Sequence, residues 1–385
     1  MRERLNAARR AFAKKRGAIP RGGEPLVLFG LLMLVPQVSY FDNPWLVMFF
    51  LVGLYAVLGF GLNVVVGFAG LLDLGYVAFF AAGAYALAIL SSYGSPLHIN
   101  LSFWLVIPMA VGIGALIGVL LGLPVLPLRG DYLAIVTLGF GEIIRIVLTN
   151  SEGLTNGAQG ISAISTPSIV VRDIGLDKEV WYYFIVIAAF AVAIVTMRLR
   201  DARVGRAWEA IREDEDVAAA MGIDVVRYKL MAFATGAAIG AFGGAIYASF
   251  YGFINPSAFS LQVSIDVLAV VIIGGMGSIR GVVFGAFILK GIPELLQFKE
   301  TADLLERLGW LRDGINRLVD GVNTLTAAHI GDLPPADTWG QEIADRRFII
   351  FGALLVAIMI LRPAGLFPSR RRQLEFAGAH EADDG

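Results

Sequence analysis

Residues 45–66 read WLVMFFLVGLYAVLGFGLNVVV, a stretch without a single charged side chain. A helix of about 20 apolar residues is long enough to span the hydrocarbon core of a bilayer. Similar apolar runs recur along the chain, near residues 68–90, 102–126, 132–148, 181–197 and 229–253. The predicted fold class is therefore all-α, a polytopic membrane protein.

Composition agrees with a membrane protein and excludes several kinds of site. Of the 385 residues, 57% are hydrophobic and 16% charged, whereas soluble domains carry about 25% charged residues. The absence of cysteine excludes disulfides and thiolate metal sites, and three widely separated histidines do not suggest a metal centre. We expect no catalytic residues, no metal, no cofactor and no nucleic-acid partner, because neither a catalytic constellation nor a basic patch with interleaved aromatics is present.

The number of segments follows from two further regions. An apolar run from Leu26 follows the basic residues 1–25, and no small-x-small cleavage site succeeds it, so we interpret it as an uncleaved first helix. Residues 263–296 are too long for one span, and the sequence GGMGSIRG at 274–281 interrupts them. We predict two segments that turn there. With a last segment at 347–361, about ten segments place both termini in the cytoplasm.

The charges between the segments support this topology. The arginine-rich loop 198–229 and tail 362–385 fall on the cytoplasmic side, and loops 150–180 and 297–346 fall outside. If 263–296 were one helix, the arginine-rich tail would lie outside. With about ten segments, residues 26–296 are expected to form the transmembrane core, and 297–346 an extracytoplasmic loop. In that loop, apolar residues from Leu304 to Leu325 recur every three or four positions, typical of an amphipathic helix that rests on lipid or its own protein, or docks an external partner.

The chain has no phosphate-binding G-x-x-x-x-G-K-[ST] loop. Transport would therefore be driven either by a partner that hydrolyses ATP or by an ion gradient. Loop 198–229 favours a partner. A short charged helix is predicted there, ending at a left-handed glycine, with a small apolar tip at 218–221 that would fit a groove on a cytoplasmic protein, although a charge run can also be a solvated loop. The predicted ATPase-coupling residues are Glu209, Glu213, Asp216, Ala218, Ala219, Met221 and Gly222.

Charged residues inside apolar runs are functional candidates. Glu142 and Arg145 are three apart and are expected to pair. Asp73 is expected to cap a broken helix, and Asp266 to reach water near the outer end of its segment. Glycines that interrupt a helix would leave its end without a continuing turn. By the helix-dipole argument, such an end could face the carboxylate of a substrate. The residues predicted for the pathway or its broken helices are Asn63, Gly67, Gly70, Asp73, Gly75, Gly274, Gly275 and Gly277.

Glycines at every fourth position follow three segments, starting at Gly114, Gly236 and Gly277. Small residues at this spacing allow two helices to pack closely. Each stripe therefore predicts either packing within the chain or a face that lines the pathway or the seam with another subunit.

Several of these stretches together resemble one known family. They are GLN at 61–63 with GFAGLLDLGYVAFF at 67–80, the loop 205–222, IGGMGS at 273–278 and RPAGLFP at 362–368. They are similar to the branched-chain amino-acid ABC transporter permeases of the LivM type, over roughly residues 45–368. The chain departs from the family pattern in two places. The coupling motif usually starts with an acidic residue and two alanines, which Asp216-Val217-Ala218 only approximates, and the loop 297–346 is longer than a minimal family member needs.

The resemblance implies an ABC importer permease architecture for leucine, isoleucine and valine. It implies four kinds of neighbour: a second homologous permease subunit, two cytoplasmic ABC ATPase subunits, a periplasmic substrate-binding protein and the lipid bilayer. The location it implies is the bacterial cytoplasmic (inner) membrane. Two alternatives remain, a related permease for urea or short amides and an ion-coupled secondary transporter; the coupling loop argues against the second, and a membrane enzyme is the least favoured.

Overall fold

The computed structural model describes residues 43–125, 128, 130–169, 172–173 and 177–295, with isolated positions between 352 and 366. The α-helices there are α3 (Asn43–Leu62), α4 (Val77–Ser91), α5 (Phe103–Val125), α6 (Asp131–Asn150), α7 (Glu152–Thr155), α8 (Lys178–Asp201), α9 (Arg203–Glu213), α10 (Glu215–Ala220), α11 (Val225–Tyr251), α12 (Leu261–Gly274), α13 (Ile279–Ala286) and α14 (Ile292–Leu295). Two π-helices, η2 (Asn63–Phe68) and η5 (Phe287–Gly291), and two 3₁₀ turns, η3 (Gly157–Gln159) and η4 (Pro256–Ala258), complete the helical elements. The strands are β1 (Ile161–Ser162), β2 (Ser168–Ile169), β3 (Arg172–Asp173) and β4 (Phe253–Ile254).

Six helices of the described part are long and apolar enough to cross a membrane. They are Trp45–Phe68, which joins α3 to η2, then α5, α6, α8 and α11, and Pro256–Gly274, which contains α12. The prediction of a helical, multi-pass membrane protein is confirmed. The predicted number of about ten segments is not confirmed, since the segment from Leu26, the segment 347–361 and the amphipathic stretch 304–325 lie largely outside the described residues.

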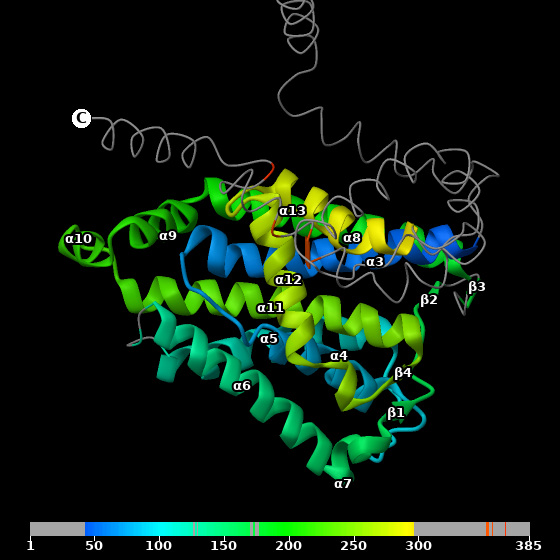
Figure 1. Ribbon diagram of the computed structural model, residues 1–385. Coiled ribbons are helices and arrows are strands. Elements are labelled where there is room, and N and C mark those ends of the chain that lie inside the picture. The colour runs from blue at the N-terminus through cyan, green and yellow to red at the C-terminus, as the bar shows by residue number, and fades with distance from the viewer. Residues whose placement is uncertain are drawn as a thin grey trace, which may run out of the picture.

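The two ends of the helix bundle carry different structures (Figure 1). At one end, β1 pairs antiparallel with β4, and Phe50 near the start of α3 contacts Trp181 of α8 and Phe250 of α11. The short helices α9 and α10 occupy the opposite end. The loops 150–180 and 198–229, assigned to opposite sides of the membrane by charge, thus lie at opposite ends of the molecule.

Small residues bring the central helices α4, α5 and α11 together. A Cβ on Gly114 of α5 would lie 2.2 Å from the Cβ of Ala241, and one on Gly118 would lie 2.6 Å from the Cβ of Ala237. A Cβ on Gly244 of α11 would lie 1.9 Å from the carbonyl oxygen of Phe80 in α4. The stripes that begin at Gly114 and Gly236 therefore pack within the chain, in agreement with the first of the two predictions made for them.

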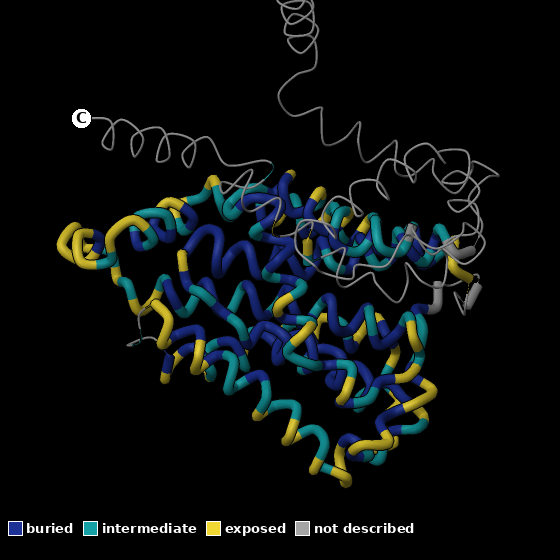
Figure 2. The backbone as a smooth tube through the Cα atoms, viewed as in Figure 1, coloured by how far each residue is buried: buried dark blue, intermediate teal, exposed yellow. Residues whose placement is uncertain are grey.

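Burial differs greatly between the spans (Figure 2). In Trp45–Phe68, 78% of the apolar window is buried inside the chain, against 22% in α6. Leu116 and Leu120 of α5 and Ile143 of α6 are exposed. The core therefore lies around α3, α4 and α11, whereas the outer faces of α5 and α6 are left to contact lipid or another protein.

The segment predicted at 68–90 begins later than expected. After η2 the chain runs without regular helix from Ala69 to Tyr76, and α4 starts only at Val77. Most of these eight residues are buried. The prediction was wrong for this stretch because an apolar run looks the same in sequence whether its backbone is helical or extended.

Candidate functional site

The first break in a membrane helix consists of the π-helix η2 and the non-helical segment 69–76 that follows it. Gly70 adopts a φ of +73°, a conformation that other residues rarely adopt. The π-helix η2 precedes it, and the amides of Ala69 and Leu71 donate to the carbonyl oxygens of Val64 and Val65 over 3.2 and 3.0 Å. Because no water reaches the interior of a bilayer, the remaining polar groups of this segment need partners from the protein.

Asp73 and Thr137 supply two of these partners. The Oδ1 atom of Asp73 accepts a hydrogen bond from the amide of Gly75 over 2.8 Å. The amide of Leu74 donates to Oγ1 of Thr137, on α6, over 3.1 Å. The prediction that Asp73 caps a broken helix is wrong, because the N-cap of α4 is Tyr76, which has no side-chain cap, and Asp73 instead accepts from Gly75 in the turn before the helix. Thr137 was not identified from the sequence, because it follows Leu74 by 63 residues.

Two further bonds attach the break to α11 and α12. The hydroxyl of Tyr76 donates to the carbonyl oxygen of Gly236 over 3.1 Å, and the amide of Val77 donates to Oγ of Ser264 over 2.9 Å. A cavity of about 10 Å³ lies between Asp73 and Phe233 of α11, with room for about one water. The break is therefore tightly closed, and this cavity is too small for an amino acid.

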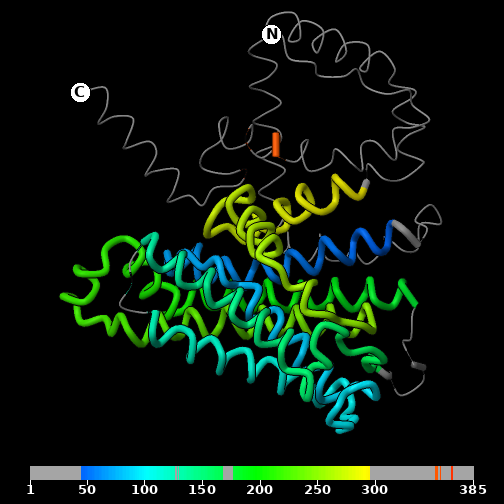
Figure 3. Tube along the Cα trace, turned by 60° about the horizontal axis from the view of Figure 1, so that its bottom comes forward, coloured from blue at the N-terminus to red at the C-terminus, as the bar shows by residue number. Residues whose placement is uncertain are grey.

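The second break is the turn between α12 and α13. Gly275 and Gly277 have φ angles of +109° and +80°, and Oγ of Ser278 caps α13 by accepting from the amide of Gly281 over 3.1 Å. A Cβ on Gly274 would lie 2.2 Å from the carbonyl oxygen of Gly281. The predicted turn within 274–281 is confirmed, and the resulting hairpin packs beside α3 (Figure 3).

The two breaks contact each other. Oδ1 of Asn63, on η2, accepts a hydrogen bond from the amide of Gly277 over 2.8 Å. A Cβ on Gly67 would lie 2.7 Å from that amide nitrogen. Nδ2 of the buried Asn63 has no hydrogen-bond partner among the described residues. Of the residues predicted for the pathway, Asn63, Gly67 and Gly277 thus lie together, whereas Gly70 and Gly75 contact other elements.

Loop 198–229, with the predicted coupling residues, forms two helices and not one. Asp214 leaves the helical conformation after α9, and its Oδ1 accepts from the amides of Asp216 and Val217 over 2.9 and 3.0 Å. It therefore caps the N-terminus of α10. The prediction of a single short helix was wrong because this cap starts a new one.

The predicted apolar tip is only partly exposed. Gly222 follows α10 with a φ of +85°, as expected of a left-handed glycine. Ala219 is exposed and Met221 is 80% exposed, whereas Ala218 is only 3% exposed. Ala218 therefore packs against its own protein, which corrects its place in the tip. Of the three acidic residues predicted here, Glu213 and Asp216 are exposed and Glu209 is half-buried.

Three side chains hold α9 and α10 to the bundle. Nε1 of Trp208 donates to the carbonyl oxygen of Tyr228 over 2.7 Å, and Nζ of the buried Lys229 pairs with Oε1 of Glu215 over 2.7 Å. Nη1 of Arg212 donates to the carbonyl oxygen of Gly67 over 2.6 Å. This last bond joins α9 directly to the first break.

Arg212 also packs on Gly70, since a Cβ there would lie 2.6 Å from Cγ of Arg212. None of Trp208, Arg212 and Lys229 was assigned a role from the sequence. Arg212 belongs to the predicted coupling loop at 205–222. Its partner Gly67 precedes it by 145 residues, and no sequence pattern predicts that contact.

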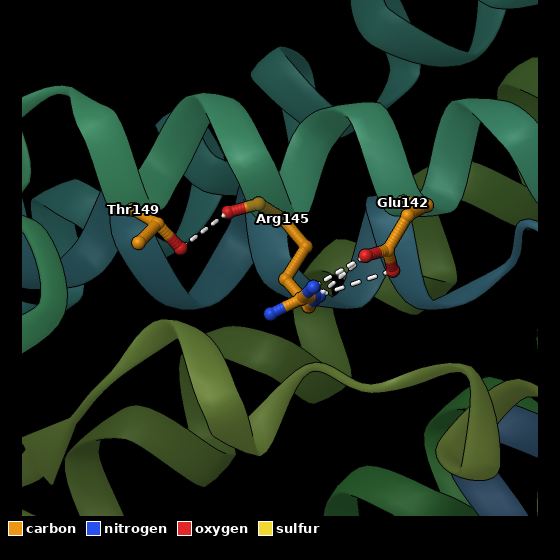
Figure 4. A network of polar contacts seen from close by, with 3 residues as sticks. All are labelled: Glu142, Arg145 and Thr149. Carbon is orange, nitrogen blue, oxygen red and sulfur yellow. Dashed lines mark hydrogen bonds and ion pairs between the residues drawn. The ribbon is translucent and has the colours of Figure 1, made fainter.

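In the described part of the chain, two ion pairs join residues of the apolar runs 132–148 and 263–296. Arg145 pairs with Glu142, as predicted, with its Nε 3.0 Å from Oε2 (Figure 4). Nζ of Lys290, on η5, lies 2.6 Å from Oδ2 of Asp266. The expectation that Asp266 simply reaches water is wrong, because its side chain is only 13% exposed and Lys290 neutralises it. Within the described residues, no group of three or more potential ligands could hold a metal ion.

Comparison with known proteins identifies the family. The family model for the permease component of branched-chain amino acid transport systems matches residues 46–308. The high-affinity branched-chain amino acid transport system permease proteins LivM of Salmonella typhimurium and Escherichia coli are each 36% identical over 344 residues, covering 84% of this chain and 69% of the relative. The permease protein LivH of Salmonella typhimurium is 29% identical over 160 residues, covering 42% of this chain and 47% of LivH.

No solved structure gives a significant match to the chain. The family model covers more than half of the chain, and both LivM relatives exceed 30% identity over most of it. The family consists of transport components and not of enzymes. The chain therefore belongs to the family of permease components of branched-chain amino acid transport systems.

Proposed function

We propose that this chain forms half of the translocation pathway of an ATP-driven importer for leucine, isoleucine and valine. The names of the LivM and LivH relatives support this substrate class. They favour it over urea or short amides, and over an ion-coupled transporter that works alone. The exposed α10 tip, with Ala219, Met221 and Gly222, docks on a cytoplasmic ATPase, together with the acidic residues Glu213 and Asp216.

The hydrogen bond between Arg212 and Gly67 is the observation that carries this proposal. It connects α9, which lies beside the docking tip, to the π-helix η2 in the membrane. Asn63 in the same π-helix binds Gly277 of the second break. A displacement of α9 by the ATPase is thereby transmitted to both breaks.

The breaks are suited to such a movement. Their glycines allow close backbone contact, as at Gly274 and Gly281, and backbone angles that other residues rarely adopt, as at Gly70 and Gly277. Discontinuous helices at mid-membrane are typical sites for substrate in transporters. We assign Asn63, Gly67, Gly70, Asp73, Gly75, Gly274, Gly275 and Gly277 to the moving parts of the pathway.

The proposed assembly contains a second permease subunit, two ATPase subunits and a periplasmic binding protein in a bacterial inner membrane. We assign about ten segments to this chain, with both termini in the cytoplasm and loop 297–346 outside. The contact between the amide of Leu366 and the carbonyl oxygen of Ile273, over 2.9 Å, supports this topology. Leu366, near the start of the predicted tail, thus lies beside the α12–α13 turn, which contacts η2 through Asn63 and Gly277.

Arg212→Ala tests the proposed coupling. The variant keeps the docking tip but loses the bond to Gly67, so we expect ATP hydrolysis to continue while leucine uptake per ATP falls strongly. The measurement is leucine uptake and ATPase activity of the complete complex in proteoliposomes. Arg206→Ala is the matched control, because Arg206 is exposed on the same helix and its side chain donates to the nearby carbonyl oxygen of Asp201. Unchanged uptake per ATP in Arg212→Ala would contradict the proposal.

A further inference from the structure

A charged pair lies deep in the membrane between α12 and η5. Nζ of Lys290 is 2.6 Å from Oδ2 of Asp266 and 4.3 Å from the ring centroid of Tyr55. Tyr55 is near the middle of the Trp45–Phe68 span, so the pair lies beside the middle of a membrane span. Charges at this depth are costly and mark functional sites.

The pair is partly exposed at the surface of the chain. The side chains of Lys290 and Asp266 are 26% and 13% exposed. Gln262, one turn before Asp266 on the same face of α12, is exposed, and its Nε2 donates to Oδ1 of Asp266 over 2.9 Å. Lipid tails offer no partner to these groups, so this face is turned toward water or another polar surface.

Apolar side chains border the pair. Ile265 lies beside Gln262 on α12 and is 43% exposed; Phe287, on η5 three residues before Lys290, is 36% exposed. The face therefore offers one cation, one anion and an adjoining apolar surface. Lys290 also lies within a π-helix, a local irregularity that often occurs at functional sites.

We infer that Asp266 and Lys290 bind the zwitterionic head group of an amino acid on its way through the membrane. Lys290 would take the substrate carboxylate and Asp266 the substrate ammonium, while the aliphatic side chain contacts Ile265 and Phe287. The pair opens and closes again around the substrate, so no charge is left unpaired in the membrane. This site rests on the proposed function and specifies its substrate contacts.

The other intramembrane pair does not fit this role. Glu142 and Arg145 lie one turn apart on a single helix, and Arg145 holds the carboxylate through both Nε and Nη2. Both oxygens of Glu142 are engaged, and both residues lie on α6, so this pair does not bridge two elements as Asp266 and Lys290 do. This pair therefore provides the control.

The test is leucine import by the complete complex, with subunits, ATP and binding protein, in proteoliposomes. Asp266→Asn combined with Lys290→Gln keeps similar shape and hydrogen bonding but removes both charges. We expect normal assembly, normal basal ATPase activity and leucine import reduced about tenfold or more, the effect of losing one charge-assisted hydrogen bond. Glu142→Gln combined with Arg145→Gln is expected to keep import. Normal import by the first variant, or an equal loss in both, would overturn the inference.

The exchanged pair, Asp266→Lys with Lys290→Asp, separates recognition from structure. If the pair only held α12 to η5, the exchanged pair would support both assembly and import. We expect normal assembly but low import, because the substrate would meet its charges in reversed positions. Full restoration of import would refute recognition.

If the charge variants fail to assemble, Gln262→Cys tests whether substrate binds at this pair. The native chain contains no cysteine, so a water-soluble methanethiosulfonate reagent would modify this chain at one position, identified by mass spectrometry. We expect modification during ATP-driven cycling and protection by leucine; an unreactive Cys, or one that leucine does not protect, would oppose the inference. Absence of leucine import in the wild-type complex would instead refute the proposed function itself.

Discussion

Gly75 is where the buried segment 69–76 crosses α6, and its backbone touches that helix. A Cβ at this position would lie 2.0 Å from the carbonyl oxygen of Thr137 and 2.7 Å from its carbonyl carbon. Both are backbone atoms, which cannot turn aside as a flexible side chain does. Gly139, two residues further along α6, faces open space, and a Cβ there would have no neighbouring element within 4 Å.

Gly75→Ala should therefore destabilise the protein, and Gly139→Ala should not. Overpacking of this kind costs about 1–3 kcal/mol of unfolding free energy, whereas alanine in an open helical position is neutral or slightly favourable. The check is the thermal unfolding midpoint of the purified complex. Equal midpoints for the two variants would show that segment 69–76 does not hold this position against α6.

Single residues show how far sequence reasoning reaches. The pair of Glu142 with Arg145 was predictable, because it depends on residues three positions apart. Lys290 was not recognised as the partner of Asp266, which precedes it by 24 residues across a turn. Long-range contacts of this kind depend on how the helices pack, and no local sequence pattern predicts them.

At the scale of elements, α9 and α10 form one anchored unit with an exposed tip. Trp208 and Arg212 attach α9 to α11 and η2, and Lys229 attaches α10 to α11. The charged helix and its final glycine were predictable from composition and spacing. The division into two helices at Asp214 was missed, although an aspartate followed by acidic residues is a recognised start of a helix.

Asp214→Ala should weaken α10 selectively. Loss of an N-cap costs about 1 kcal/mol of helix stability, which in a helix of six residues loosens the whole element. We expect faster hydrogen exchange in residues 215–221 and weaker capture of the ATPase subunits in pull-down. Asp214→Asn keeps a cap and should behave as wild type. If Asp214→Ala exchanges and docks normally, α10 does not depend on this cap.

At the scale of the whole molecule, hydrophobic runs predicted the spans well. The runs at 102–126 and 181–197 correspond to α5 at Phe103–Val125 and α8 at Lys178–Asp201. The extended segment between η2 and α4 was missed, since its residues are as apolar as those of a helix. Positions of the breaks could be expected from glycines, but their mutual contact through Asn63 and Gly277 appears only in three dimensions.

The central claim is that this chain forms half of the translocation pathway of an ATP-driven amino-acid importer. The most direct measurement is uptake of labelled leucine by the reconstituted complex with proton and sodium gradients collapsed. We predict uptake that requires ATP and the ATPase subunits, that isoleucine and valine compete with, and that urea does not affect. Uptake by this chain without the ATPase subunits, driven by an imposed ion gradient, would contradict the account.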